Sequence, residues 1–383
     1  MFKPARILQV ALVIFAVAGC AAPPAPVASG ITAAPQQTDS KPTLKPDPPP
    51  IRYGDSQSAR TVYHLPDGEL SPWLAKWADE VASSRDIPLE TVTSLLKDVR
   101  YNAQAARLMA PSKGRIKRSW VTYRGRFVDP IRIKVGAEFW QQHQQLLAQT
   151  EDKYGVPAAI IVAIIGVETV YGRHTGDFKV LDALATLGFS YPDNTRPERG
   201  ELFRNQLADL IDLHHQGKLN AQQAYGSYAG AMGLPQFMPG SLMRYAVDGD
   251  NDGRIDLFNS MPDIMESVAH FLIVHGWQPG LPVFVEATLP TDPQSFVHGG
   301  LEPTHTWAEL QRQGASSARA ESALWANRPL SIINLVDEPR STVEYRIATE
   351  NFFAITHYNR SYFYAASVAE LANALSREMG QGG

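Results

Sequence analysis

The sequence predicts a mainly helical protein of the α+β class, in which a small β-containing segment is inserted into a helical body. Apolar residues recur with the 3.6-residue period of an α-helix in several stretches between 71 and 280, and again near the C-terminus. Between 281 and 355 the period shortens towards 2, which is typical of strands. The chain has 383 residues, which is long enough for about two domains.

The first predicted helices lie between Ser71 and Val99. Ser71 and Pro72 supply a cap and a first-turn proline. The apolar residues that follow stand at i, i+3, i+4 and i+7, namely Leu74, Trp77, Ala78 and Val81. A second helix is expected to start at Pro88, because Val92, Leu95, Leu96 and Val99 share one face.

The central helices are marked by glycine and proline. A helix is expected over 137–154, ending at Gly155, because glycine is common just after a helix C-terminus. Pro157 then opens a helix over 158–172. Three more helices are expected at about 198–214, 264–275 and 367–375.

The strands are expected where apolar residues alternate with other residues. One such run contains Val283, Val285, Ala287 and Leu289, and the other contains Val343, Tyr345 and Ile347.

Charge and motif content exclude several classes of function. The net charge is −4 and no stripe of Lys and Arg is present, so the sequence gives no electrostatic footprint for nucleic acid. No His pair has zinc-like spacing, and neither a phosphate-binding glycine loop nor a G-x-S-x-G motif occurs.

The N-terminus has the pattern of a secretory signal peptide. Lys3 and Arg6 precede an apolar stretch over 7–19 that is too short to span a bilayer, which needs about 18 to 20 apolar residues. The only cysteine, Cys20, follows Val-Ala-Gly and resembles the lipidated cysteine of a bacterial lipobox. The stretch 20–52 is rich in proline and poor in large apolar residues, so we expect a semi-rigid tether.

One glutamate, Glu168, interrupts the apolar run AAIIVAIIGVETVYG at 158–172. On a helix it shares a face with Ile161, Ile164, Ile165 and Tyr171. Burial raises the pKa of a carboxyl group, and a carboxylic acid still protonated near neutral pH can serve as a general acid. From position alone, a structural glutamate paired with an arginine such as Arg173 is an equally good interpretation.

The stretch GSYAGAMGLPQFMPGS, at 226–241, is dense in glycine and alanine, which let a backbone approach a flat ligand closely. Ser227 and Gln236 supply hydrogen-bonding groups there. Composition alone allows either a tight turn between helices or a ligand-binding segment.

Taken together, IIGVETVYG, ALATLGFSYP (183–192), the stretch 226–241 and HYNRSYFYAASVAELA (357–372) resemble one family. It is the B-type membrane-bound lytic murein transglycosylases, lipoproteins that cut the glycan strands of peptidoglycan. The resemblance covers about 71 to 375. It implies a lysozyme-like (goose-type-like) catalytic core with an additional helical domain and a small β-containing domain.

The resemblance also implies a mechanism with one carboxyl group. Glu168 would protonate the glycosidic oxygen between N-acetylmuramic acid and N-acetylglucosamine, and would then accept the proton of the muramyl C6 hydroxyl as that oxygen attacks C1. The product end is 1,6-anhydromuramic acid, and no catalytic cofactor is required. Ser227 would orient Glu168 and Gln236 would face the sugar. Further sugar contacts are implied for Tyr191, Tyr358, Asn359 and Tyr364, each of which has a core or capping role as its alternative.

The acidic loop DGDNDGRIDLFN, at 248–259, has an EF-hand-like pattern. Asp248, Asp250 and Asp252 stand at loop positions 1, 3 and 5, and Arg254 at position 7 offers a backbone oxygen. Asn259 replaces the glutamate at position 12, and in the family a lengthened loop supplies the last carboxylate, which matches Asp263. We therefore expect a structural Ca²⁺ here, although an acid such as Asp263 in a first helical turn is also favourable without a metal.

Two alternatives remain open at the level of sequence. A muramidase would hydrolyse the same bond with water, and a binding-only lipoprotein would attach to peptidoglycan without cleaving it. The expected location is the periplasm, with a lipid anchor at the inner face of the outer membrane of a Gram-negative bacterium, because Ala21 is not the aspartate that resembles an inner-membrane retention signal. Protein partners in cell-wall synthesis or hydrolysis are compatible with this location. The predicted organisation is a signal peptide (1–19), a tether (20–52), a helical domain and lysozyme-like core (53–280), a small β-containing domain (281–356) and a C-terminal helix that returns to the core (357–383).

Overall fold

The structure, a computed structural model, describes residues 61–112 and 114–381. The predicted signal peptide, Cys20 and the tether lie outside the described residues. Within those residues no helix combines the length and the apolar character needed to cross a membrane.

The protein is mainly helical, as the sequence predicts. In the N-terminal half, the helices are α1 (Pro72–Arg85), α2 (Leu89–Lys97), α3 (Ala103–Met109), α4 (Trp120–Phe127), α5 (Pro130–Gln142), α6 (Gln144–Tyr154) and α7 (Ala158–Thr169). The remaining helices are α8 (Val180–Phe189), α9 (Pro197–His215), α10 (Pro239–Tyr245), α11 (Met261–Val274), α12 (Trp307–Arg312), α13 (Glu350–Thr356) and α14 (Tyr362–Glu378). The strands are β1 (Phe178–Lys179), β2 (Tyr225–Gly226), β3 (Ser331–Asp337) and β4 (Thr342–Ala348).

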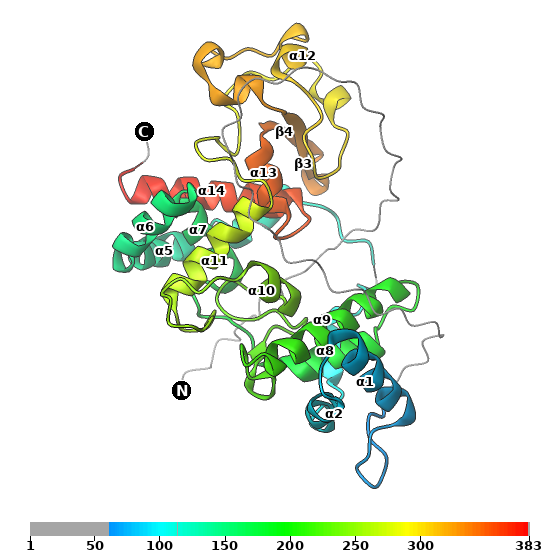
Figure 1. Cartoon of the computed structure of the whole chain (residues 1–383). Coiled ribbons are helices and arrows are strands. Elements are labelled where there is room, and N and C mark those ends of the chain that lie inside the picture. Colours follow the sequence, from blue (N-terminus) through cyan, green and yellow to red (C-terminus); the bar gives the residue numbers. More distant parts are fainter. Residues whose placement is uncertain (1–60, 113, 382–383) are drawn as a thin grey trace, which may run out of the picture.

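Most helices form two neighbouring groups, with α12 and the β3–β4 hairpin beyond them (Figure 1). At one end α1 and α2 lie with α8 and α9, and α8 packs along α9. In the middle α7 packs against α5, α6, α11 and α14. The last helix therefore returns to the central group, next to the helix that carries Glu168.

α7 is buried because it is apolar on every side and lies at the centre of the group. Its N-terminus has no side-chain cap of its own, but the Glu151 carboxylate accepts the Ala158 N–H at 2.9 Å. A helix that is hydrophobic all round is stable only when other elements enclose it. α7 thus forms the rigid centre of the fold.

Most predicted helices are confirmed, with one clear correction. The expected helix at 137–154 is two helices, α5 and α6, which are separated at His143 (φ −114°, ψ 21°). α5 begins seven residues earlier than expected, at Pro130, because the Asp129 side chain caps it by accepting the N–H groups of Ile131 and Arg132. The helix expected to reach Gly172 ends at Thr169, and the last helix begins at Tyr362 after the Ser361 cap.

The predicted strands are partly wrong. β4 contains the alternating run of Val343, Tyr345 and Ile347, and it pairs antiparallel with β3. The run from Val283 to Leu289 makes isolated bridges only, Phe284 with Ala348 and Thr288 with Ser316. In β3, apolar and polar residues do not alternate along the sequence. Five of its seven residues are buried, and a strand buried on both faces needs no alternation.

Two apolar clusters underlie the fold. The larger extends from Tyr63 to Leu375 and includes α7 and α14. The smaller contains Leu281, Val285, Trp307, Leu310, Ala315, Trp325, Leu330, Ile332 and Ile347. The smaller cluster falls inside the predicted β-containing domain, whereas Ile333 and Phe352 of the same segment belong to the larger one. The domain boundaries stay a prediction.

Candidate active site

Glu168 is the only residue of α7 that is not fully buried; all the other residues from Ala158 to Thr169 are enclosed. Its side chain is half-buried and stands in the last turn of an otherwise apolar helix. A carboxyl group in this setting is largely removed from water but is not fully enclosed. Catalytic acids of this kind have a pKa that an apolar environment raises.

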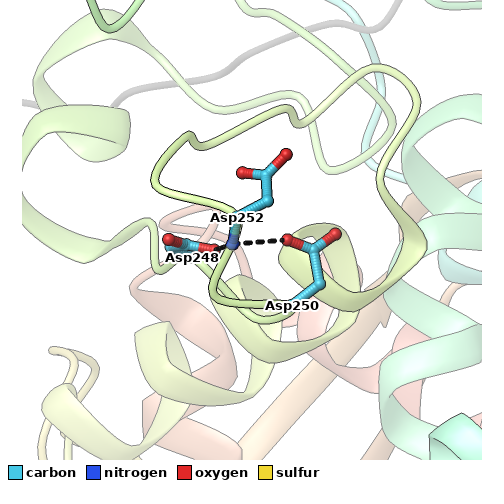
Figure 2. Close-up of side chains that lie close together, drawn as sticks. All are labelled: Asp248, Asp250 and Asp252. Atoms are coloured by element: carbon cyan, nitrogen blue, oxygen red, sulfur yellow. Dashed lines mark hydrogen bonds between the residues drawn. The ribbon is translucent and has the colours of Figure 1, made fainter.

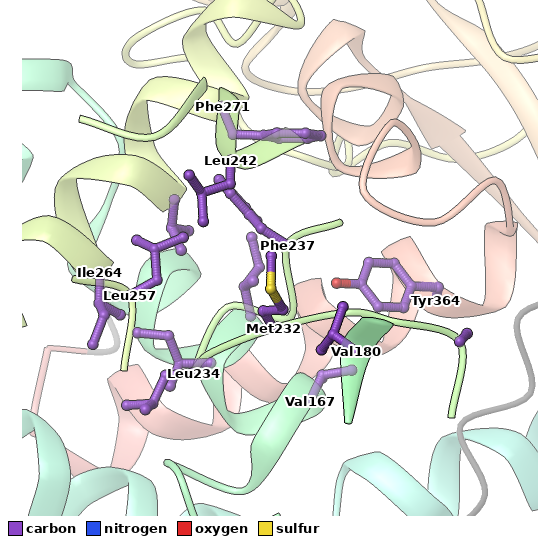
Figure 3. Close-up of a cluster of buried hydrophobic side chains, with 14 of the residues drawn as sticks. Val167, Val180, Met232, Leu234, Phe237, Leu242, Leu257, Ile264, Phe271 and Tyr364 are labelled. Atoms are coloured by element: carbon purple, nitrogen blue, oxygen red, sulfur yellow. The ribbon is translucent and has the colours of Figure 1, made fainter. Parts of the chain in front are cut away.

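Tyr364 provides the hydrogen bond to this carboxyl group. Its hydroxyl donates to Glu168 Oε1 at 2.6 Å, and the tyrosine is 1% exposed. The residue is fixed because Ser361 caps α14 and accepts the Tyr364 N–H, while α14 packs against α7. Figure 3 shows Tyr364 near Val167 and Met232 in the buried apolar cluster.

The environment makes Glu168 a weaker acid than an ordinary glutamate. Burial raises the pKa of Glu168 from 4.5 to about 7, and the Tyr364 hydroxyl counteracts part of this rise because it stabilises the carboxylate. Burial and the nearby Glu168 raise the pKa of Tyr364 well above its ordinary value, so Tyr364 remains a hydrogen-bond donor. Near neutral pH, Glu168 is therefore present both as acid and as carboxylate.

Ser227 does not make the contact that the resemblance implied. Its Oγ accepts the N–H groups of Ala229 (3.3 Å) and Ala231 (3.0 Å), and no hydrogen bond joins it to Glu168 among the described residues. Ser227 instead stabilises the tight turn that follows β2. Tyr364 is the residue that hydrogen-bonds Glu168 here.

Thr169, which sequence reasoning did not single out, connects α7 to this turn segment. Its hydroxyl is fully buried and lies 3.1 Å from the Leu234 carbonyl oxygen and 3.3 Å from that of Ile165, while its Oγ1 accepts the Gly172 N–H. The threonine next to the glutamate therefore fixes the end of α7 against the segment 226–241.

Gln236 and Tyr358 fix the same segment. Gln236 has a positive φ of 52°, and its Nε2 donates to the carbonyl oxygens of Thr175 and Gly233. The amide nitrogen is thus used within the protein, although the half-buried side chain was expected to face a sugar. Tyr358 donates to the Pro235 carbonyl oxygen at 2.9 Å and stacks on Tyr364 with 6.3 Å between ring centroids.

The other predicted sugar contacts occupy different places. Tyr191 is 9% exposed, stacks on Phe203 and accepts a 3.4 Å hydrogen bond from Arg199, which places it against α9. Asn359 is half-buried in the turn between α13 and α14, where its carbonyl oxygen accepts the Ser361 N–H. Their roles toward a sugar stay predictions.

Tyr123 is a further residue at the site that sequence reasoning missed. It lies on α4, in contact with Phe127 and Phe363, and the charge of Glu168 is one cause, after burial, of the raised pKa of its hydroxyl. No pattern in the sequence marks it, because α4 has only eight residues and its neighbours at the site are distant in the chain.

The acidic loop brings three predicted metal ligands together. One carboxylate oxygen from each of Asp248, Asp250 and Asp252 lies within 4.8 Å of the other two (Figure 2). The loop is shaped by its own hydrogen bonds, since the Asp252 N–H donates to both Asp248 and Asp250. Hard carboxylate oxygens around a turn are the donor set that Ca²⁺ prefers, so this part of the loop fits the ion.

Asp263, the last carboxylate that the resemblance implies for the metal, lies in the first turn of α11. It is 1% exposed, and its two carboxylate oxygens accept the N–H groups of Gly249 (2.8 Å) and Asp256 (2.7 Å). It therefore ties Gly249 and Asp256 of the loop to α11, and it is not one of the three grouped aspartates. The Arg254 N–H donates to Asp252, and the Asn259 side chain donates to Asp256.

A mainly helical fold in which a buried helix carries a glutamate with a raised pKa agrees with the lysozyme-like class of glycan-cleaving enzymes that the sequence predicts. The family model for the transglycosylase SLT domain matches residues 69–373. The chain therefore belongs to this family and is a lytic murein transglycosylase, an enzyme that cleaves peptidoglycan.

Individual relatives agree with this assignment. The chain is 35% identical over 260 residues to the membrane-bound lytic murein transglycosylase B of Escherichia coli K12, a match that covers 67% of this chain and 68% of that protein. The structure of the soluble lytic transglycosylase SltB1 from Pseudomonas aeruginosa is similar with a TM-score of 0.71 and 38% identity, over 81% of this chain and 100% of that one. The Escherichia coli lytic transglycosylase Slt35 in complex with calcium is similar with a TM-score of 0.68 and 31% identity, over 81% and 94% of the two chains.

Proposed function

We propose that Glu168 is the only acid/base of this transglycosylase. It protonates the glycosidic oxygen as the bond from that oxygen to the muramyl C1 breaks. The resulting carboxylate then takes the proton of the muramyl C6 hydroxyl as the C6 oxygen bonds to C1. Protons and bonds balance without water, and the product is a 1,6-anhydromuramyl end.

The observation that supports the proposal is the raised pKa of Glu168. A pKa of about 7 lets one carboxyl group donate a proton and then accept one at neutral pH. Ordinary glycosidases need a second carboxyl group to activate water or to serve as a nucleophile. Among the acids nearest in sequence, Asp182 accepts the Arg100 N–H at 2.8 Å in the first turn of α8, and Asp177 lies in the loop before β1. We assign neither of them a catalytic role.

Tyr364 completes the proposed acid. Tyr364 holds one carboxylate oxygen and stabilises the charged state between the two proton transfers. Tyr358 stacks on Tyr364 and fixes the segment 226–241 through Pro235. We assign the sugar contacts to Tyr358, Asn359, Tyr364, Tyr191 and Gln236, with Ser227 shaping the backbone beside them.

The proposal extends to metal and location. Asp248, Asp250 and Asp252 would hold a structural Ca²⁺, which stabilises the loop between α10 and α11 and takes no part in the chemistry. The calcium complex of Slt35 supports this assignment. Lipidation of Cys20 would anchor the enzyme at the inner face of the outer membrane in the periplasm, in agreement with the membrane-bound relative.

The test is cleavage of purified peptidoglycan sacculi by the Glu168→Gln variant. We expect binding to sacculi without release of fragments. Glu266→Gln is the matched control, because Glu266 is also a buried glutamate that accepts a tyrosine hydroxyl, that of Tyr154, and it is expected to cleave normally. Release of fragments by Glu168→Gln at the wild-type rate would show that Glu168 is not the acid/base.

A further inference from the structure

The turn directly after Glu168 is strained. Val170 and Tyr171 have φ values of 51° and 59°, in the left-handed region that glycine favours. For a β-branched residue such as Val170 this conformation is a genuine outlier. Such strain persists only where the surrounding structure holds it, and it is often found at functional sites.

The side chain of Tyr171 holds this turn in place. Its hydroxyl donates to the Arg132 carbonyl oxygen on α5 at 3.0 Å, and its ring lies against Phe139 with 5.4 Å between centroids. Tyr171 therefore ties the turn after α7 to the neighbouring helix.

Two glycines make room for the tyrosine. A Cβ atom at Gly136 would lie 2.2 Å from the Tyr171 hydroxyl oxygen, and one at Gly166 would lie 2.4 Å from it. Both distances are far below a van der Waals contact, so α5 and α7 each carry glycine where the tyrosine inserts. Arg132 closes the connection, because its Nε donates to the Gly166 carbonyl oxygen at 3.1 Å.

We infer that Tyr171 is a positioning residue that fixes the last turn of α7 and with it the direction of the Glu168 side chain. Glu168 lies between the two points of attachment, Gly166 and Tyr171, so a shift of either changes its place relative to Tyr364. The inference rests on the proposed role of Glu168. It concerns orientation and not the fold, because α7 is already enclosed by four other helices.

The experiment measures kcat and KM of the full chain on a soluble glycan fragment of peptidoglycan, per folded molecule. Tyr171→Phe keeps the ring between the glycines and removes only the hydrogen bond to Arg132. Tyr171→Leu removes both. Because small displacements of a catalytic group can cost up to about 100-fold in rate, we expect kcat to fall about threefold for Tyr171→Phe and at least about tenfold for Tyr171→Leu, with KM within about twofold.

Tyr345→Phe is the matched control, since it also removes one tyrosine hydrogen bond, to Gln294 next to the β3–β4 hairpin, and should leave kcat unchanged. A kcat within about twofold of the wild type for both Tyr171 variants would overturn the inference, as would an activity loss that only follows loss of folded protein in circular dichroism. Glu168→Gln is assayed in parallel to separate the positioning role of Tyr171 from the acid/base role of Glu168. A Glu168→Gln variant that remains active would refute the role of Glu168 itself.

Discussion

Replacement of Tyr364 by phenylalanine tests how the site sets the acidity of Glu168. The variant keeps the buried ring and removes the hydroxyl that donates to Glu168 Oε1 at 2.6 Å. This donor stabilises the carboxylate, so its loss raises the pKa of Glu168 above the present value of about 7. Hydrogen bonds to charged groups contribute about 1.5 to 3 kcal/mol, and the lower end applies because Glu168 is half-buried.

A change of about 1.4 kcal/mol corresponds to one pH unit, so the expected shift is about one unit upward. The assay is the pH dependence of kcat/KM, which reports the ionisation of the free enzyme. Because Glu168 must first donate a proton, the wild type should lose activity as the pH rises through about 7, and the variant should lose it near pH 8. If the loss of kcat/KM at alkaline pH occurs at the same pH in the variant as in the wild type, or at a lower pH, this account of the acid is refuted.

Three further predictions concern stability and metal. The pKa of Glu168 is higher in the folded protein than the ordinary 4.5, so the cost of burying it is absent below about pH 4.5 and is reached in full above about pH 7. Glu168→Gln should therefore be more stable than the wild type at pH 8, by about 3 kcal/mol in urea unfolding, and equally stable at pH 4; equal stability at pH 8 would contradict the burial argument. Calcium should raise the melting temperature by about 2 to 4 °C when its concentration is about ten times the Kd, and Asp250→Asn should abolish the increase; an increase that survives in the variant would place the ion elsewhere. Thr169→Val should cost about 1 to 3 kcal/mol, because it leaves the Gly172 N–H and the Leu234 carbonyl oxygen without Thr169 Oγ1; thermal unfolding that matches the wild type would show that this connection is dispensable.

The sequence allowed the helices to be predicted where a cap or a stop coincides with an apolar face. α1 and α2 illustrate this, since periodicity and a proline start agree in both. The start of α5 was missed although Asp129 and Pro130 supply a cap and a proline, because apolar and charged residues alternate from Ile131 to Val135 and hide the helical period. β3 was missed because a strand buried on both faces does not alternate.

The site was predictable in part. A lone glutamate in an apolar helix made Glu168 a candidate, and the family resemblance favoured its catalytic role over a structural one. The C-terminal motif pointed to Tyr364, which hydrogen-bonds Glu168 in the structure. The contact expected of Ser227 could not be checked from sequence, because its hydroxyl satisfies local backbone groups that only the turn geometry defines. The roles of Tyr123 and Tyr171 follow from contacts between elements that are distant in the chain and from backbone strain. Neither of these leaves a periodic signal in the sequence.

The most direct test of the single acid/base is mass spectrometry of the ends that the enzyme releases from sacculi in water enriched in ¹⁸O. The account predicts muramyl ends that are lighter by one water than hydrolysed ends and contain no ¹⁸O, because the C6 oxygen of the sugar forms the new bond. It also predicts no release by Glu168→Gln. Reducing ends that carry ¹⁸O would show hydrolysis and would require a second group that activates water.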